Sequence, residues 1–329
     1  MIRNQWYAVL EGKQVPRGKP VGATRMGEKL VFWRDKAGKV ACISDICCHR
    51  GAALSLGEVH GDHVACPFHA FAYDSTGQVR VIPANGKNAP VPERYRVKSY
   101  PVREVGGLVF LWWGDEREKL PEVPFFDDLL DSRFSYGSFH DPWPVHYSRS
   151  VENQLDVMHV PFVHYNTIGR GCRTLVHGPS VQVDGTRLTF RVKNVADDGS
   201  TVPEKPEEVT GVERLTSLQF QFPNLWQNLI TDRMRVFAAF APVDEQNSVV
   251  YIRYYQAFTR LPVLRHLVNW LGIVFSKKVL AQDKAVVVTQ VPVRSDYAMG
   301  EKLAQGDRPI AEYRRVRYEL MRQAGQLGE

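Results

Sequence analysis

The segments CCHRG at residues 47–51 and CPFH at residues 66–69 decide how this chain is interpreted. Between their inner ligands lie sixteen residues, which gives the spacing C-x-H-x16-C-x2-H. Each segment offers one thiolate and one imidazole, and a glycine and a proline supply the chemistry of tight turns. Two such loops can hold a two-iron cluster, with two cysteines on one iron and two histidines on the other.

A single tetrahedral zinc ion is the competing interpretation, because two cysteines and two histidines also suit zinc. Zinc modules usually pair their cysteines in one knuckle and their histidines in another. In this chain each loop mixes the two ligand types. The pattern therefore favours an iron–sulfur cluster held by four residues: Cys47, His49, Cys66 and His69.

A second group of metal-binding side chains lies in NQLDVMHVPFVH at residues 153–164. Asp156 and His159 are three positions apart, so on a helix they share one face. On an unbroken helix His164 would point about 140° away from His159. Pro161 disturbs the helical hydrogen bonds and lets His164 turn back toward the same centre. Two imidazoles and one carboxylate form the triad of non-haem Fe(II) oxygenases, which leaves coordination positions open for O₂.

The carboxylate of that triad must come from farther along the chain. Asp283 is the best candidate, because it follows an expected amphipathic helix and lies in an apolar context where an unpaired acid would be costly. On the residues alone, other acids remain possible: Asp232, Asp244 and Asp296.

Length and composition indicate an ordinary globular protein. The chain has 329 residues, enough for two domains with separate cores, and a mild net charge of +6. Its five cysteines do not suggest a secreted disulfide framework. No hydrophobic signal segment begins the sequence, and polar residues interrupt the apolar stretch 261–275, which predicts an amphipathic helix. We expect a cytoplasmic protein with neither a nucleic-acid nor a membrane partner.

The first 115 residues read as β-rich. We expect strands at 30–33 and 40–43 and hairpins at 71–81 and 102–113, followed by a connection at 114–131. The second part mixes strands and helices, with a hairpin at 182–192, strands at 234–240 and 249–255, and a helix near the end. On that helix Ile310, Tyr313, Val316 and Leu320 form the apolar side. We expect the basic residues off this stripe to form a solvated face: Arg314, Arg315, Arg317 and Arg322.

Together the two ligand sets resemble the oxygenase (α) component of Rieske non-haem iron oxygenases. The resemblance extends from Trp6-Tyr7 to Gln282-Asp283 and includes the iron motif N-x2-D-x2-H-x4-H, which begins at Asn153. It implies that Asp283 completes the iron site with His159 and His164, and that Asn153 is a further catalytic candidate. It also implies that Asp156 is no ligand but joins His159 to a cluster histidine of a neighbouring subunit.

This resemblance implies an α+β fold. An N-terminal all-β Rieske domain would span residues 1–115. A C-terminal α+β catalytic domain of the helix-grip (START-like) type, with an antiparallel sheet, would span 116–329. It also implies a head-to-tail homotrimer, because cluster and iron within one subunit would lie too far apart for electron transfer. The chain is most similar to the shorter vanillate, toluenesulfonate and dicamba demethylases.

The implied cofactors are a [2Fe–2S] cluster and a mononuclear Fe(II), and the implied activity is hydroxylation or oxidative demethylation of a small aromatic or alicyclic substrate with O₂. No G-x-G-x-x-G segment follows a strand, so electrons from NAD(P)H would come through a separate reductase, with or without a ferredoxin. A ring-dihydroxylating dioxygenase component is one alternative. A Rieske electron-transfer protein with a non-catalytic second half is another.

Several residues depart from the family pattern. Cys48 stands where proline is common, and Ala70-Phe71 replaces the frequent Gly-Trp. Phe68 leaves no partner for the additional disulfide of high-potential Rieske proteins, so we expect a potential toward the low end of the Rieske range. Four dispersed aromatic and aliphatic residues could line a substrate pocket or simply pack in the core: Phe220, Trp226, Leu229 and Phe240.

Overall fold

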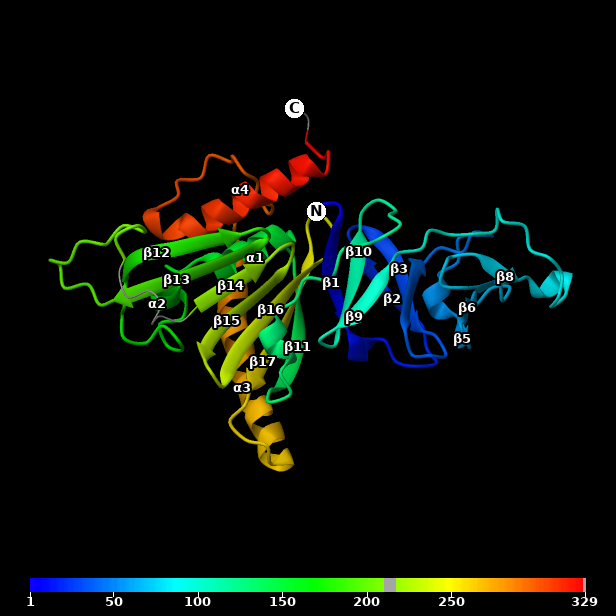
Figure 1. The fold of residues 1–329 in the computed structure, drawn as a ribbon, viewed down its shortest axis with the longest axis horizontal. Coiled ribbons are helices and arrows are strands. Elements are labelled where there is room, and N and C mark those ends of the chain that lie inside the picture. Colours follow the sequence, from blue (N-terminus) through cyan, green and yellow to red (C-terminus); the bar gives the residue numbers. More distant parts are fainter. Residues whose placement is uncertain (210–216, 328–329) are drawn as a thin grey trace. The chain divides into compact units, whose positions relative to one another are not determined.

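The computed structural model describes residues 1–209 and 217–327. The chain forms two compact units that divide between Val123 and Pro124 (Figure 1). The segment 116–123, expected to belong with the second half, packs on the first unit, where the Trp6 indole N–H donates to the Pro121 carbonyl over 2.9 Å.

The first unit consists of three small antiparallel sheets, with strand orders β1-β10-β9, β2-β3-β4 and β5-β6-β7-β8. Alternation of apolar residues and tight glycine turns produces these hairpins. Gly106 and Gly107, for example, both adopt positive φ between β9 and β10. The strands and hairpins expected in this part are confirmed. Their bounds are β1 Gln5–Glu11, β2 Val21–Arg25, β3 Glu28–Arg34, β4 Val40–Ser44, β5 Glu58–His60, β6 His63–Ala65, β7 Ala72–Tyr73, β8 Val79–Val81, β9 Val102–Val105 and β10 Leu108–Trp113.

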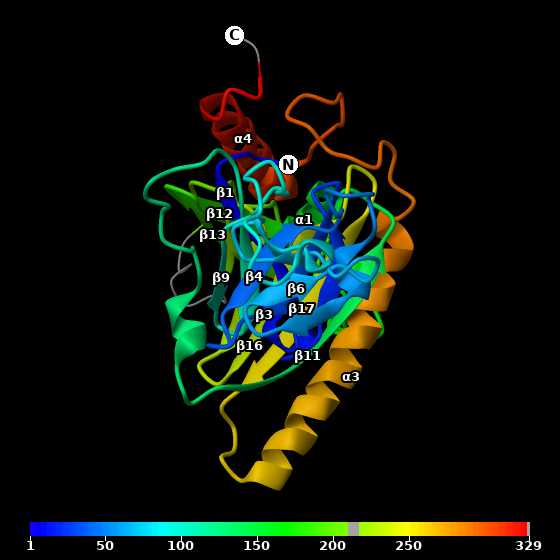
Figure 2. The same ribbon diagram turned by 90° about the vertical axis from the view of Figure 1, so that its right-hand side faces the viewer.

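The second unit is built on one seven-stranded antiparallel sheet with the order β11-β17-β16-β15-β14-β13-β12. The strand bounds are β11 Ser135–Trp143, β12 Leu175–Asp184, β13 Arg187–Val195, β14 Ser217–Gln221, β15 Leu225–Thr231, β16 Met234–Pro242 and β17 Ser248–Gln256. The helices are α1 Tyr147–Leu155, α2 Val160–Val163, α3 Pro262–Val287 and α4 Arg308–Gln323. The predicted α+β class, with helices laid on an antiparallel sheet, is confirmed (Figures 1 and 2).

The two faces of this sheet are covered differently. On one face Tyr254 and Gly137 meet α3, and Phe220 packs edge-on against Tyr313 of α4 with ring centroids 5.3 Å apart. On the other face Phe237 contacts the rings of Phe125 and Phe126. The metal-binding candidates of the second half lie on or next to α1, α2 and α3, on the helix-covered face.

The expectation of a solvated basic face on α4 is wrong for two of its four arginines. Arg314 and Arg317 are buried, at 5% and 2% exposure. Arg314 donates to both carboxylate oxygens of Glu152 on α1, at 2.7 and 2.9 Å, and to Glu301. Burial works against this guanidinium, but ion pairs with Glu152 and Glu301 outweigh it and raise its pKa. Arg314 therefore ties α4 to α1, and Arg317 donates to the Ser295 carbonyl instead of facing solvent.

Replacing Arg314 by methionine is expected to lower the free energy of unfolding by about 3 kcal/mol, because Glu152 keeps its charge in a buried site with one partner fewer. Urea unfolding monitored by circular dichroism measures this. The matched control is Arg315→Met on the same helix, whose side chain is 41% exposed and pairs with Glu312 and Glu319. That control should cost about 1 kcal/mol or less. Equal losses in both variants would contradict the role of the buried ion pairs.

Candidate cluster site and metal centre

Two tight turns bring together the four candidate cluster ligands. The first turn follows β4, where the Cys47 N–H donates to the Ala52 carbonyl and the Gly51 N–H donates to the Cys47 carbonyl, both at 2.8 Å. The second follows β6 and repeats the pattern, with 2.9 Å bonds from Cys66 N–H to the Phe71 carbonyl and from Ala70 N–H to the Cys66 carbonyl. Ala70 adopts a φ of 55°, a conformation that favours glycine. This explains why glycine is frequent at that position in the family.

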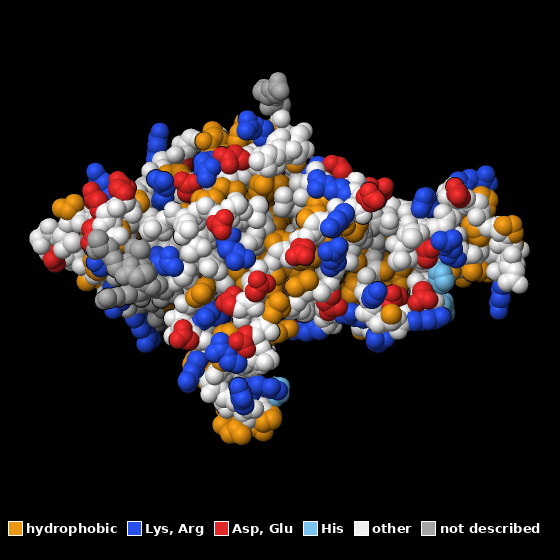
Figure 3. All heavy atoms as spheres, viewed as in Figure 1, with side chains coloured by type: hydrophobic (Ala, Val, Ile, Leu, Met, Phe, Trp, Pro, Cys, Tyr) orange, Lys and Arg blue, Asp and Glu red, His pale blue; other side chains and the backbone are white. Residues whose placement is uncertain are grey.

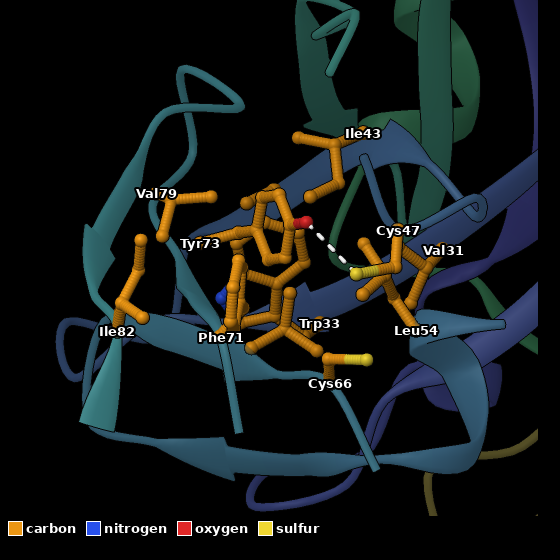
Figure 4. Packing of buried hydrophobic residues seen from close by; sticks show 12 residues of the cluster. Val31, Trp33, Ile43, Cys47, Leu54, Cys66, Phe71, Tyr73, Val79 and Ile82 are labelled. Atoms are coloured by element: carbon orange, nitrogen blue, oxygen red, sulfur yellow. Dashed lines mark hydrogen bonds between the residues drawn. The ribbon is translucent and has the colours of Figure 1, made fainter. Parts of the chain in front are cut away.

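The sulfur and imidazole ligands differ in burial. Cys47 and Cys66 are each 3% exposed and belong to the apolar cluster around Val31 and Trp33 (Figure 4). His49 and His69 are exposed, with ring centroids 4.7 Å apart. Phe71 stacks on the His49 ring at 4.9 Å and fixes its plane.

These features fit a [2Fe–2S] cluster with one buried cysteine-bound iron and one histidine-bound iron at the surface. Burial raises the pKa of the Cys66 thiol, and its closeness to Cys47 raises it further. If either cysteine lost its proton, the other would not stabilise the negative charge of the thiolate. Iron would replace both protons and supply the missing positive charge.

Tyr73, which the sequence analysis did not single out, lies between two sulfurs. Its hydroxyl is 3.1 Å from Cys47 Sγ and 3.2 Å from Cys48 Sγ, and it accepts a 3.0 Å hydrogen bond from the Cys48 N–H. Burial raises the pKa of Tyr73, so the phenol keeps its proton. Because a cluster-bound Cys47 has no proton, the Tyr73 O–H must be the donor to that sulfur. Cys48 is exposed and reaches the same oxygen from the other side.

Replacing Tyr73 by phenylalanine is expected to lower the midpoint potential of the cluster by roughly 50 mV. The hydrogen bond from Tyr73 stabilises the reduced cluster, which carries more negative charge, and the variant removes that hydrogen bond. Redox titration followed by EPR measures the shift. Cys48→Ala serves as the control, since it removes the neighbouring thiol but leaves the Tyr73–Cys47 contact. A potential that is unchanged in Tyr73→Phe would show that this hydroxyl does not act on the cluster.

In the second unit, the helix around Asp156 is organised differently from the expectation. It does not run through Asp156 and break at Pro161. Helix α1 ends at Leu155, Asp156 is extended, and α2 starts after His159. The Asp156 carboxylate accepts hydrogen bonds from the backbone N–H groups of Met158 and His159, at 2.6 and 3.2 Å. Asp156 thus caps the turn that carries His159, while Pro161 lies in the first turn of α2, where proline is tolerated.

His159, His164 and Asp283 converge, and one ligand atom from each lies within 4.8 Å of the others. His164 Nε2 is 2.9 Å and His159 Nε2 is 3.4 Å from Asp283 Oδ1. We expected Asp283 to follow the amphipathic helix. In the structure it lies within α3, near the C-terminal end of that helix. It is 2% exposed, and Oδ1 has no well-formed hydrogen bond within residues 1–209 and 217–327. A buried, under-satisfied oxygen facing two imidazoles fits a divalent metal ion.

The residue before Asp283 orients one of the imidazoles. Gln282 Oε1 lies 3.0 Å from His164 Nδ1 and also accepts a hydrogen bond from the Thr167 hydroxyl. The Gln282 amide donates to Asn166, which fixes its own orientation. Nδ1 of His164 therefore carries the proton, and Nε2 is free for a metal ion. The sequence analysis missed Gln282 because its signal, a polar residue next to an expected ligand, is common on any helix.

The charges of the metal site keep Asp283 deprotonated and His159 protonated. Burial would raise the pKa of Asp283, but the two imidazoles outweigh it and lower the pKa to about 2. Burial would lower the pKa of His159, but Asp156 and Asp283 outweigh it and raise the pKa to about 9. Without metal, His159 is thus an imidazolium between two carboxylates. A metal ion would displace that proton and take over its charge.

Asp156 is arranged differently from a ligand. One of its oxygens, Oδ1, is 3.7 Å from His159 Nδ1, on the side away from the triad. The other oxygen has no hydrogen-bond partner among the described residues. The side chain is 28% exposed. Asp156 therefore positions His159 with one oxygen, through the backbone N–H groups of the turn and through its charge near Nδ1, and its second oxygen is free to meet another group.

The remaining candidates lie nearby or in the core. Asn153 is on α1, and its amide nitrogen is buried with no hydrogen-bond partner in the described part of the chain. Phe220 and Phe240 are fully packed, and Trp226 is buried with an indole N–H that is likewise unpaired in that part. Leu229 is only partly buried. Core packing accounts for the two phenylalanines.

Comparison with known families gives one match in each of the two units. Residues 5–101 match the Rieske [2Fe–2S] domain, and residues 143–323 match the vanillate O-demethylase oxygenase C-terminal domain. The chain belongs to the Rieske oxygenase family. The second match alone covers more than half of its length.

Among the relatives of this chain is the toluene-4-sulfonate monooxygenase system iron-sulfur subunit TsaM1 of Comamonas testosteroni, 33% identical over 207 residues. That match covers 61% of this chain and 58% of the relative. The chloroplastic protein TIC 55 of Arabidopsis thaliana is 26% identical over 328 residues, with 94% of this chain and again 58% of the relative covered. The chain thus spans a little over half the length of these relatives.

Solved structures share the fold. Dicamba monooxygenase bound to 3,6-dichlorosalicylic acid superposes with a TM-score of 0.80 at 20% identity, covering 99% of each chain. NdmA of Pseudomonas putida gives 0.78 at 21% identity, covering 98% of this chain and 94% of that one. The predicted pairing of a β-rich Rieske domain with a C-terminal antiparallel sheet and helices is confirmed.

Proposed function

We propose that this chain is the terminal oxygenase component of a Rieske system, which hydroxylates or oxidatively demethylates a small aromatic or alicyclic substrate. The observation that carries the proposal is the convergence of His159, His164 and Asp283 in a chain that also has the complete cluster-ligand pattern. Named relatives include a toluene-4-sulfonate monooxygenase subunit and dicamba and vanillate O-demethylase components.

In this proposal residues 1–115 hold a [2Fe–2S] cluster through Cys47, His49, Cys66 and His69. Residues 116–329 hold Fe(II) through His159, His164 and Asp283, with Asn153 as an additional catalytic candidate. The iron would supply O₂ activation, and the cluster would supply electrons one at a time.

The residues around the iron site prepare it for this chemistry. Gln282 holds the proton of His164 on Nδ1, so that Nε2 faces the triad. Asp156 Oδ1 lies 3.7 Å from His159 Nδ1, where its charge favours a proton on that nitrogen, and the second oxygen of Asp156 would serve electron transfer from a neighbouring subunit. We therefore propose a homotrimer in which Asp156 bridges two chains. Electrons would come from NAD(P)H through a separate reductase, with or without a ferredoxin.

Product analysis tests the proposal. Purified protein loaded with iron and sulfide is combined with a surrogate reductase, NADH and a panel of methoxylated, N-methylated and alicyclic compounds. A hydroxylated or demethylated product, formed in proportion to NADH consumed and absent with His164→Ala, supports an oxygenase. Reduction of the cluster without any product across the panel would favour the electron-transfer alternative, and a colourless preparation without a Rieske EPR signal would favour zinc.

Labelling with ¹⁸O₂ distinguishes the two oxygenase classes. One labelled atom in the product identifies a monooxygenase, and two identify the ring-dihydroxylating alternative. The mass of the holoprotein in analytical ultracentrifugation tests the trimer, and cell fractionation tests the proposed cytoplasmic location.

A further inference from the structure

Helix α3 has two opposite faces. At about 100° per residue, one line of residues points into the fold and includes the metal-ligand candidate. These residues are buried: Asn269, Ser276, Leu280, Asp283 and Val287. The opposite line, in the first half of the helix, consists of seven exposed apolar residues that we call the α3 stripe: Val263, Leu264, Leu267, Trp270, Leu271, Val274 and Phe275.

The stripe is unusual for a surface. Its seven side chains are 47% to 80% exposed, with Trp270 at 60%. Apolar residues on ordinary protein surfaces are scattered singly, whereas a contiguous apolar patch marks an interaction site. This half of α3 extends beyond the edge of the sheet in both ribbon views, and apolar side chains gather at its free end (Figures 1, 2 and 3).

Positive charges predominate around the stripe, although one acid, Asp131, interacts with Arg260 just before α3. Arg260 precedes the helix, and Lys277 and Lys278 follow the stripe on exposed positions, whereas Arg265 lies on the side of α3 that faces the fold. From Gln246 to Gln282 the sequence contains no aspartate or glutamate. A helix that combines an apolar face, a tryptophan and flanking lysines and arginines is typical of segments that lie in the interface of an anionic membrane.

A second copy of this chain fits the stripe less well. Pairing two stripes, parallel or antiparallel, would bring cations of one chain beside cations of the other. Repulsion between these like charges would oppose such a pairing.

An acidic redox protein would match the cations but not the apolar face. Electron-transfer encounters use small, weak interfaces that must dissociate between turnovers. Seven exposed apolar side chains would bind such a partner through its own apolar surface and slow its release. A lipid surface needs neither shape complementarity nor release.

We propose that the α3 stripe binds the surface of a membrane that contains anionic lipids. The apolar side chains would enter the boundary between headgroups and acyl chains, and the lysines and arginines would meet lipid phosphates. None of the helices in the described part of the chain is both long and apolar enough to cross a membrane. The expectation that this chain has no membrane partner rested on spanning segments, which a helix lying in the interface does not need.

Vesicle flotation of the full-length holoprotein tests the proposal, with phosphatidylcholine vesicles that do or do not contain phosphatidylglycerol. The wild type should float with the anionic vesicles. The double variant Leu267→Asp/Leu271→Asp should bind about tenfold more weakly, and Lys278→Glu should lose most of the preference for phosphatidylglycerol. The matched control is Val202→Asp/Val291→Asp, which changes two residues that are 80% and 87% exposed outside α3. This control should float like the wild type.

A second measurement does not depend on how the aspartate variants fold. Lipids brominated on the acyl chains should quench part of the tryptophan fluorescence of the wild type, and Trp270→Phe should abolish that part. Quenching that survives in Trp270→Phe would overturn the proposal, as would a wild type that does not float or a control pair that loses binding equally.

The other occupants would each give a distinct result. If Leu267→Asp/Leu271→Asp lowers the assembled mass in lipid-free ultracentrifugation, the stripe is an interface between copies and the proposal fails. If the same variant, without lipid, slows reduction of the cluster by the surrogate reductase, the stripe binds a protein partner and the proposal also fails. Neither result depends on whether the chain oxidises a substrate.

Discussion

Asp283→Ala is expected to reduce the iron content from about three to about two atoms per chain and to lower turnover by at least about 100-fold. The reason is that the variant removes the only carboxylate that meets both His159 and His164 among the described residues. The two remaining irons belong to the cluster, so the Rieske EPR signal should stay unchanged. Metal analysis and EPR on the same sample measure both effects.

The control for this variant is Asp232→Ala. Asp232 is an exposed acid that the sequence alone left open as a ligand, and it lies outside the triad. It should keep three irons and full turnover. An Asp283→Ala protein that retains its third iron would refute the proposed ligand set, whatever its activity.

Asp156→Asn is expected to lower turnover by about 100-fold while both metal centres stay occupied. Asparagine preserves an oxygen that can accept hydrogen bonds from the N–H groups of Met158 and His159, so the turn should remain. It removes the negative charge that holds His159 and that would bridge to a neighbouring subunit. Stopped-flow reduction should show a cluster that accepts electrons normally but is reoxidised slowly in the presence of substrate and O₂.

Asp198→Asn is the matched control for Asp156→Asn. Asp198 accepts hydrogen bonds from the N–H groups two and three residues ahead, at 2.9 and 2.8 Å, which is the same arrangement as at Asp156. It lies in an exposed turn away from the histidines. Normal turnover in Asp156→Asn would rule out the bridging role, whereas a loss in both variants would point to capping alone.

The features that could be predicted from the sequence are those written in local patterns. Alternating apolar residues around Gly106-Gly107 predicted β9 and β10, and ligand spacing within single loops predicted the two cysteine–histidine turns. His159 and His164 were selected because both lie in one short segment. In each case the residues that decide the structure lie within a few positions of one another.

Features that depend on distant residues were missed or misplaced. Burial of Arg314 requires Glu152, which is 162 positions away, so α4 alone resembled a solvated basic helix. Tyr73 reaches Cys47 only because strand β7 and the loop after β4 meet in space. At Asp156 the local pattern was ambiguous, since an acid three residues before His159 suits both a helix face and a helix cap. In the structure Asp156 caps the turn that follows α1.

The bond between His164 and Gln282 joins positions 118 residues apart, and Asp283 is the next residue. A metal ion held by His164 and Asp283 would therefore close a very long loop, and the entropy of the unfolded chain would fall accordingly. Bound iron would therefore raise the thermal stability of the catalytic unit, in addition to any part in chemistry. Chelation should lower the melting temperature of that unit and leave the melting of the cluster-bearing unit in place.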